Sequence, residues 1–94
     1  MIEKMTEYEV NTLLTSSKEI MRFKSEKSMF YVYKLNSLLI VEGFQYYGRE
    51  GGKRINMDEI IDILENKFGK KLRLTKRFEK QNLCDTHYVF VFSS

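Results

Sequence analysis

The side chains most able to do chemistry in this sequence are cations and tyrosines, and they concentrate in two stretches. The first, QYYGREGGKR (residues 45–54), combines two tyrosines with three cations around a glycine-rich segment: Tyr46, Tyr47, Arg49, Lys53 and Arg54. The second spans residues 67–80 and carries seven Lys and Arg side chains, with Glu79 as its only carboxylate. Clustered cations attract anionic partners. We therefore predict that both stretches contribute to a binding surface.

Within the second stretch, KLRLTKRF (71–78) has the composition of a β-strand. An extended chain would place Leu72, Leu74 and Phe78 on one face, and Lys71, Arg73, Thr75 and Arg77 on the other. Same-face residues of a strand lie about 6.6 Å apart. The pattern thus predicts a straight row of cations, which would follow a phosphate backbone without reading the bases. The alternative is a solvated edge strand whose lysines prevent unwanted pairing.

The glycine-rich stretch does not match a nucleotide-binding loop. A Walker A loop needs glycine five residues before its Gly-Lys pair and Ser or Thr after it, but those positions hold Tyr47 and Arg54. The acidic helix start that follows would also repel a phosphate. We interpret GREGGKRIN (48–56) as a long strand-to-helix connection whose cations contact an anionic partner. The alternative is a connection that is longer than needed but has no role in binding.

Catalytic and metal-binding patterns are weak. His87 is the only histidine, so no histidine pair is available to bind a metal. Cys84 and His87 would be the minimal nucleophile and base, but QNLCDTH is more typical of a turn entering a strand. The enzymatic alternative is a metal-independent ribonuclease drawing on four side chains: Tyr46, Tyr47, Arg49 and Arg73. We predict a non-enzymatic protein with no catalytic residue, metal site or cofactor.

Composition predicts one globular domain over residues 1–94. The chain is 43% apolar and 31% charged, which is enough apolar content for one core. No run of about 18 apolar residues is present, so no membrane partner is expected. The start, MIEKMTEYEV, has charges where a signal peptide needs an apolar stretch, and a lone Cys84 fits a reducing compartment. We therefore expect a cytoplasmic protein.

Helix and strand signals alternate along the chain. Thr6 and Glu9 have the spacing of a capping box, which predicts a short helix over residues 7–16. Apolar residues at helical intervals from Met57 to Phe68, closed by Gly69, predict a second helix. Five stretches have strand composition: EIMRFK, SMFYVYKL, LLIVEGFQYY, KLRLTKRF and HYVFVF. The order α-β-β-β-α-β-β predicts an α+β domain, with a mainly antiparallel sheet of about five strands and helices on one face.

Several strands are apolar on both faces. Phe30 and Val32 alternate with Tyr31 and Tyr33, and HYVFVF (87–92) shows the same pattern. Strands of this kind are normally covered on both faces. Since two modest helices are expected on one face, the other would need a loop, a second copy of the chain in a homodimer, or a partner. Phe44 and Tyr46 are interpreted first as packing residues within this sheet.

Two functions fit these patterns. The first is a binding module for nucleic acid or a nucleoprotein complex, acting through the basic loop and strand; DNA and RNA both fit. The second follows from the size and the amino-acid composition of the chain. A small domain rich in Lys and Ile and without proline resembles the accessory proteins of phages and mobile elements, among them anti-CRISPR and other host-takeover inhibitors. That resemblance implies an inhibitor or regulator that docks on a protein through its aromatic sheet face or an edge strand.

Overall fold

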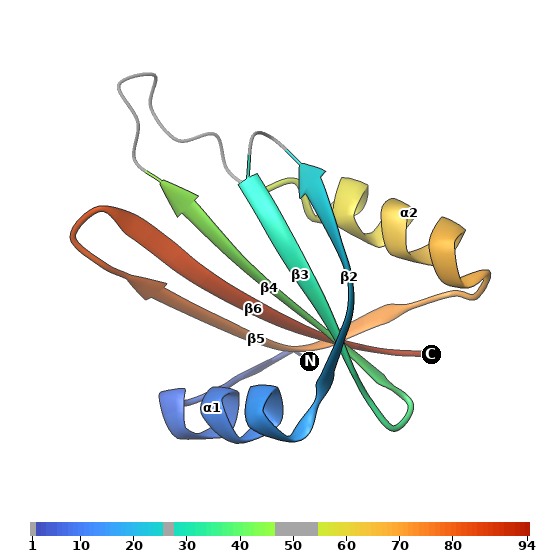
Figure 1. Cartoon of the computed structure of the whole chain (residues 1–94), viewed down its shortest axis with the longest axis horizontal. Coiled ribbons are helices and arrows are strands. Elements are labelled where there is room, and N and C mark those ends of the chain that lie inside the picture. Colours follow the sequence, from blue (N-terminus) through green and yellow to red (C-terminus); the bar gives the residue numbers. More distant parts are fainter. Residues whose placement is uncertain (1, 26–27, 47–54) are drawn as a thin grey trace.

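Six strands and two helices make up the described part of the chain, residues 2–25, 28–46 and 55–94 of the computed structural model (Figure 1). The α+β fold and the order of the predicted elements are confirmed. The elements are β1 (Glu3–Lys4), α1 (Glu7–Ser16), β2 (Lys18–Ser25), β3 (Ser28–Leu35), β4 (Leu38–Tyr46), α2 (Met57–Phe68), β5 (Arg73–Gln81) and β6 (Asp85–Ser93).

All six strands belong to one sheet with the order β1-β5-β6-β4-β3-β2. Neighbouring strands are antiparallel, except that β1 runs parallel to β5. The prediction of about five strands missed β1, which consists of two residues paired with Lys76 and Arg77. So short a segment shows no alternation of apolar and polar residues, and only its pairing with β5 makes it a strand.

Local signals set the helix ends as predicted. The Thr6 hydroxyl accepts a hydrogen bond from the Glu9 N–H at 3.2 Å, and the Glu9 carboxylate accepts one from the Thr6 N–H at 3.4 Å. This capping box starts α1. The Asn56 side chain caps α2 by accepting from the Glu59 N–H. Gly69 ends α2 in the left-handed conformation, at φ 68°, which a side chain would strain.

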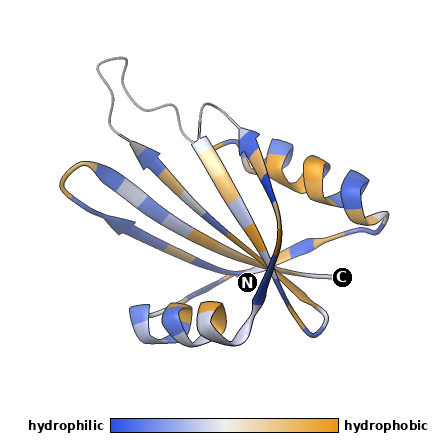
Figure 2. Ribbon diagram, viewed as in Figure 1, coloured by the Kyte–Doolittle hydropathy of each residue, from blue (hydrophilic) through white to orange (hydrophobic). Residues whose placement is uncertain are grey.

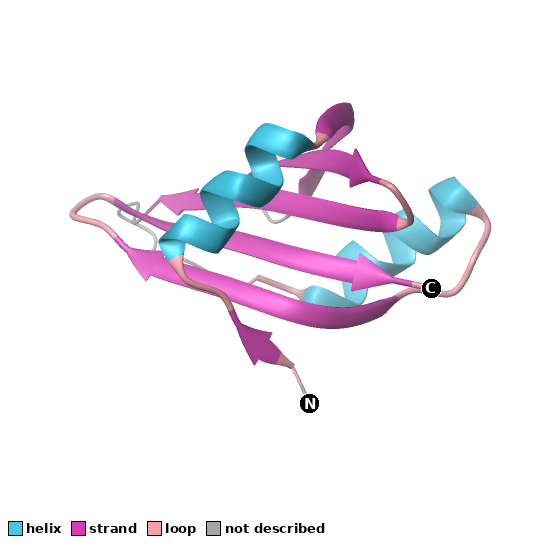
Figure 3. Ribbon diagram, turned by 90° about the horizontal axis from the view of Figure 1, so that it is seen from below, coloured by secondary structure: helices cyan, strands magenta, loops and turns pink. Residues whose placement is uncertain are grey.

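The two helices cover opposite faces of the sheet, so the prediction of helices on one face is wrong. Figure 3 shows α1 across the near face, with α2 behind the sheet. The reason lies in the connections. The strand pairings make β1 parallel to β2, and β4 parallel to β5, so each helix is a crossover between parallel strands. The two crossovers run in opposite directions along the sheet, and right-handed crossovers in opposite directions place their helices on opposite faces.

Each helix buries its own core cluster. On the α2 face, Ile60 and Leu64 are fully buried, while Ile61 and Phe68 are partly buried. They pack on alternate residues of the central strands: Phe30, Val32, Leu39, Val41, Phe90 and Phe92. Figure 2 shows the hydrophobic and hydrophilic residues alternating along α2. On the α1 face, Val10 packs with the intervening residues, Ile40, Phe78, Val89 and Val91. Each helix therefore covers part of one face, and the sheet does not have the single uncovered face that was expected.

Close packing on the α2 face depends on Gly43. A Cβ atom at this position would lie 2.3 Å from the Phe30 ring. Gly43 and Phe30 are register partners on neighbouring strands, so the glycine makes room for the aromatic ring.

Within the described residues, neither helix is long and apolar enough to cross a membrane.

Candidate nucleic-acid interface

The predicted row of cations along β5 is broken by a β-bulge, so that prediction is wrong. Leu74 lies opposite Phe92 and Lys76 opposite Val91, which leaves Thr75 as an extra residue. The Thr75 hydroxyl donates to the Val91 carbonyl at 3.2 Å. One inserted residue reverses the alternation of side chains beyond it. Leu74 accordingly packs in the α2 cluster, whereas Phe78 packs in the α1 cluster.

The reversal separates the predicted site residues of this strand. Arg77 lies on the α2 face, in a groove of about 460 Å³ that it lines with Met57 and Phe90. Arg73 precedes the bulge and alternates with Leu74, so it points to the opposite face at the start of β5. Lys71 lies before the strand, in the exposed connection after α2. The three predicted cations therefore do not share one face.

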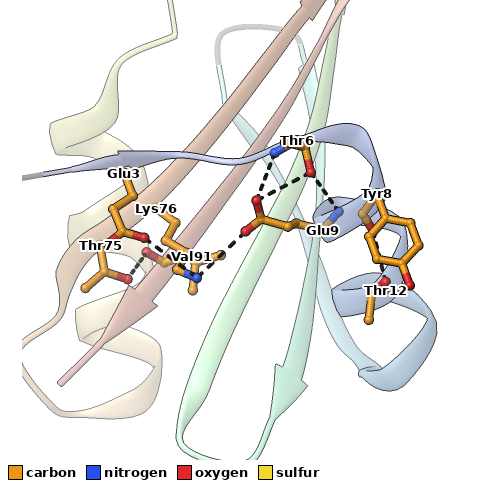
Figure 4. Close-up of polar contacts among 8 residues, drawn as sticks. All are labelled: Glu3, Thr6, Tyr8, Glu9, Thr12, Thr75, Lys76 and Val91. Atoms are coloured by element: carbon orange, nitrogen blue, oxygen red, sulfur yellow. Dashed lines mark hydrogen bonds and ion pairs between the residues drawn. The ribbon is translucent and has the colours of Figure 1, made fainter.

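Cations beyond the bulge are paired with carboxylates. Figure 4 shows Lys76 between Glu3 and Glu9, with Nζ 3.9 and 4.0 Å from their oxygens. Arg77 contacts Glu79 at 3.3 Å, and Lys80 forms an ion pair with Glu7. Exposed ion pairs contribute little stability, but they reduce the positive potential that a phosphate would meet. This half of β5 is a poor phosphate site.

Most of the described cations without a carboxylate partner lie at the other end of the sheet, with Lys4 and Lys24 as exceptions. This cationic end is defined by Lys18, Lys34, Lys67, Lys70, Lys71 and Arg73, all of them exposed. Among the described residues, only Lys71 of this group has a carboxylate within 4.0 Å, that of Glu65 at 3.9 Å. Lys67, Lys70 and Lys71 also lie at the negative end of the α2 dipole, which favours cations there.

Strand register brings these cations together. Lys18 and Lys34 are partners across β2 and β3, and their row continues through Leu39 and Phe92 to Leu74. Leu39, Phe92 and Leu74 belong to the α2 cluster, so the two lysines also point to the α2 face. Neighbouring strands are about 4.8 Å apart, so the row from β5 to β2 spans about 19 Å. Lys70 and Lys71 precede its β5 end, where Arg73 lies next to Leu74 but points to the α1 face.

Four residues of the predicted loop site lie outside the described residues: Tyr47, Arg49, Lys53 and Arg54. Tyr46 is the last residue of β4, where its backbone is the register partner of Asp85. The proposed contribution of this loop to binding stays a prediction.

A polar cluster on the α1 face was not predicted from the sequence. The Glu42 carboxylate accepts a hydrogen bond from the Tyr33 hydroxyl at 3.1 Å and lies 2.8 Å from Nε2 of His87. The Glu42 and His87 side chains are 14% and 19% exposed. Burial, together with the charge and hydrogen bond of Glu42, raises the pKa of Tyr33 to about 12. The available signal was Glu42 itself, a carboxylate inside an otherwise apolar strand.

Aromatic rings continue this cluster toward the end of β4. Phe44 and His87, partners across β4 and β6, have parallel rings with centroids 4.4 Å apart. This contact confirms Phe44 as a cross-strand packing residue. On the neighbouring strands, the Arg22 guanidinium lies 4.9 Å from the centroid of the Tyr31 ring. Arg22 also forms an ion pair with Glu19 at 3.2 Å.

The predicted Cys84–His87 neighbourhood forms a turn. Cys84 is exposed, and the Asp85 carboxylate accepts from the Asn82 side chain at 2.9 Å. His87 faces Glu42 instead. No group of three or more His, Cys, Asp or Glu side chains in the described ranges is arranged to hold a metal ion.

Comparisons of the chain with protein-family models, with curated proteins and with solved structures gave no match. We therefore infer a function from the geometry of this chain.

Proposed function

We propose that this protein binds nucleic acid through the cationic end. The observation that carries the proposal is the pairing of Lys18 with Lys34. Like charges directly opposite each other on neighbouring strands destabilise a sheet. Both lysines are exposed on the same face, and no carboxylate of the described residues neutralises either one. A phosphate bound between the two lysines would offset their repulsion. A role in binding would therefore explain why the sheet contains a lysine pair that destabilises it.

The spacing of the cationic end suits a charged polymer better than a single anion. Its cations lie near the two ends of a row of about 19 Å, Lys18 and Lys34 at one end and Lys70 and Lys71 near the other, rather than converging on one point. Such a surface contacts several phosphates at once and carries no base-reading geometry. We therefore expect binding of low sequence specificity that weakens steeply as salt rises.

The inhibitor alternative has less support from the edges of the sheet. The β2 edge carries Lys18, Glu19, Arg22 and Lys24 and is interrupted by an irregularity between Glu19 and Met21. Charges and bulges are the devices that prevent another strand from adding to an edge. The opposite edge is partly occupied, because β1 pairs with Lys76 and Arg77 of β5. Docking by strand addition is thus disfavoured at both edges.

A matched pair of variants tests the proposal. The triple variant Lys18→Gln, Lys34→Gln and Arg73→Gln removes three unpaired cations. The control, Lys76→Gln, Arg77→Gln and Lys80→Gln, removes three paired ones and changes the net charge equally. Binding of fluorescent DNA and RNA would be measured by anisotropy at several salt concentrations.

We expect the first triple variant to lower the slope of log K against log salt by about 2 to 3, since three phosphate contacts are lost. The control should keep most of the affinity and the slope. Because Lys18 and Lys34 repel each other, the first variant should also be at least as stable as the wild type. Failure of the wild type to bind either polymer at low salt would refute the function and direct attention to a protein partner.

A further inference from the structure

A second surface of the molecule combines flat rings with cations. Arg22, Tyr31, Phe44 and His87 occupy four adjacent strands, β2, β3, β4 and β6, on the α1 face. None of the four belongs to the cluster packed beneath α1. Figure 3 shows α1 crossing this face obliquely, with the turn between β5 and β6 extending beyond the helix. We call these four residues the stacking surface.

The rings of this surface are held in place by their neighbours. His87 is fixed by the 2.8 Å contact with Glu42 and by an edge contact with Phe78, whose centroid is 5.6 Å away. Phe44 is fixed by its parallel contact with His87. Arg22 is held over Tyr31 by its ion pair with Glu19. Rings and guanidinium planes held in this way lose little conformational entropy when another flat group stacks on them.

Charge on the same face favours an anionic strand. Of its carboxylates, Glu19 is bonded to Arg22, and Glu42 to Tyr33 and His87. Glu3, Glu7 and Glu9, on the β1 and α1 side of this face, form ion pairs with Lys76 and Lys80, and Asp85 accepts a hydrogen bond from Asn82. Lys24, which follows Arg22 on this face by strand alternation, is exposed and has no ion pair among the described residues. Phosphates of a bound strand would therefore meet Lys24 rather than a free carboxylate, while Arg22, whose charge is paired with Glu19, would contribute mainly its guanidinium plane.

We infer that the stacking surface binds unpaired bases of a single-stranded nucleic acid, an inference that rests on the proposed function. Bases of a single strand stack on aromatic rings and on arginine planes, whereas bases in a duplex are stacked on each other and inaccessible. Strand register puts Tyr31 opposite Glu42, two residues before Phe44. The surface therefore offers two flat platforms, Arg22 over Tyr31 and Phe44 beside His87, for about two bases. The cationic end contributes affinity for any nucleic acid, and the stacking surface adds a preference for single strands.

Two conservative variants test this inference. Phe44→Leu keeps an apolar side chain of similar size but removes the ring, and Arg22→Lys keeps the charge but removes the plane. Their affinities for an oligothymidine and for a duplex of equal length would be compared with those of the wild type. A 2-aminopurine base placed in the oligonucleotide would report stacking through loss of its fluorescence. Circular dichroism would confirm that both variants fold.

We expect the wild type to prefer the single strand and to quench 2-aminopurine. Each variant should bind the single strand about 5- to 150-fold more weakly, with unchanged duplex binding and reduced quenching. Equal single-strand affinity in the wild type and both variants would overturn the stacking surface and favour a protein as its occupant. That result leaves the cationic end intact if its triple variant still loses affinity. Absence of all binding by the wild type refutes both proposals.

Discussion

Glu42 is the side chain that organises the polar residues of the α1 face. It lies 86% buried in the sheet, where a carboxylate without partners would be costly. The Tyr33 hydroxyl and His87 supply those partners, and each comes from a different neighbouring strand. The pairing fixes the orientation of His87 and, through it, the ring of Phe44. A single buried carboxylate thus positions two rings of the stacking surface, those of His87 and Phe44.

Titration of Tyr33 gives a pH prediction. Its pKa is raised from 10.0 to about 12, so the folded protein holds this proton more tightly than the unfolded chain does. Its contribution to stability is therefore fully present below about pH 10 and is lost as pH rises through about 12. Urea unfolding between pH 8 and 12 should show this loss in the wild type. The Tyr33→Phe variant should lose less stability over the same range, and an identical pH dependence would contradict the assignment.

Gly43 provides a packing prediction. Gly43→Ala would place a methyl group 2.3 Å from the Phe30 ring, so the ring or the backbone must move. Overpacking of this kind costs about 1–3 kcal/mol. The free energy of unfolding, measured in urea, should fall by that amount. Combining it with Phe30→Leu, which shortens the side chain, should cost less than the sum of the two single changes. Strict additivity would show that the two residues do not interact as described.

Among the elements, α2 depends on tertiary packing rather than on its own sequence. Its stripe buries Ile60 and Leu64 completely against the middle of the sheet. A helix of 12 residues is marginal in isolation, so these contacts keep it folded. The same packing places its C-terminal lysines at the cationic end.

Leu64→Ala should therefore destabilise the protein strongly. Removing a fully buried leucine side chain costs about 2–5 kcal/mol, from lost burial and from the cavity that remains. Asp62→Ala, on the exposed side of the same helix, is the matched control and should change stability by less than about 0.5 kcal/mol. Thermal and urea unfolding would check both. Similar effects of the two variants would contradict the packing of α2.

Across the entire protein, the ion pairs among the described residues decide where positive charge is available. The net charge of a segment is a poorer guide. The basic half of β5 meets acidic residues of β1 and α1, so its cations are largely neutralised. Lysines that come from β2, β3 and α2 remain unpaired within the described ranges. The nucleic-acid proposal therefore shifts from one strand to an end of the sheet to which several elements contribute. A binding surface made in this way is absent until the sheet has formed.

Short-range patterns were enough to predict the helices and most of the strands. The capping box of Thr6, the apolar stripe from Met57 to Phe68 and the stop at Gly69 each depend on residues within a few positions of one another. Alternation likewise assigned Phe30 and Val32 to one face and Tyr33 to the other. These features are encoded locally because backbone hydrogen bonding and side-chain periodicity act over one or two turns.

Three features required the folded chain. The bulge at Thr75 changes the face of every later residue in β5, and nothing in KLRLTKRF marks it. The assignment of α1 and α2 to opposite faces follows from crossover direction, which depends on strand order. Glu42 and His87, 45 residues apart, and Lys18 and Lys34 meet only through strand register. Strand register and crossover direction arise from long-range pairing, so the tertiary structure alone decides which side chains share a surface.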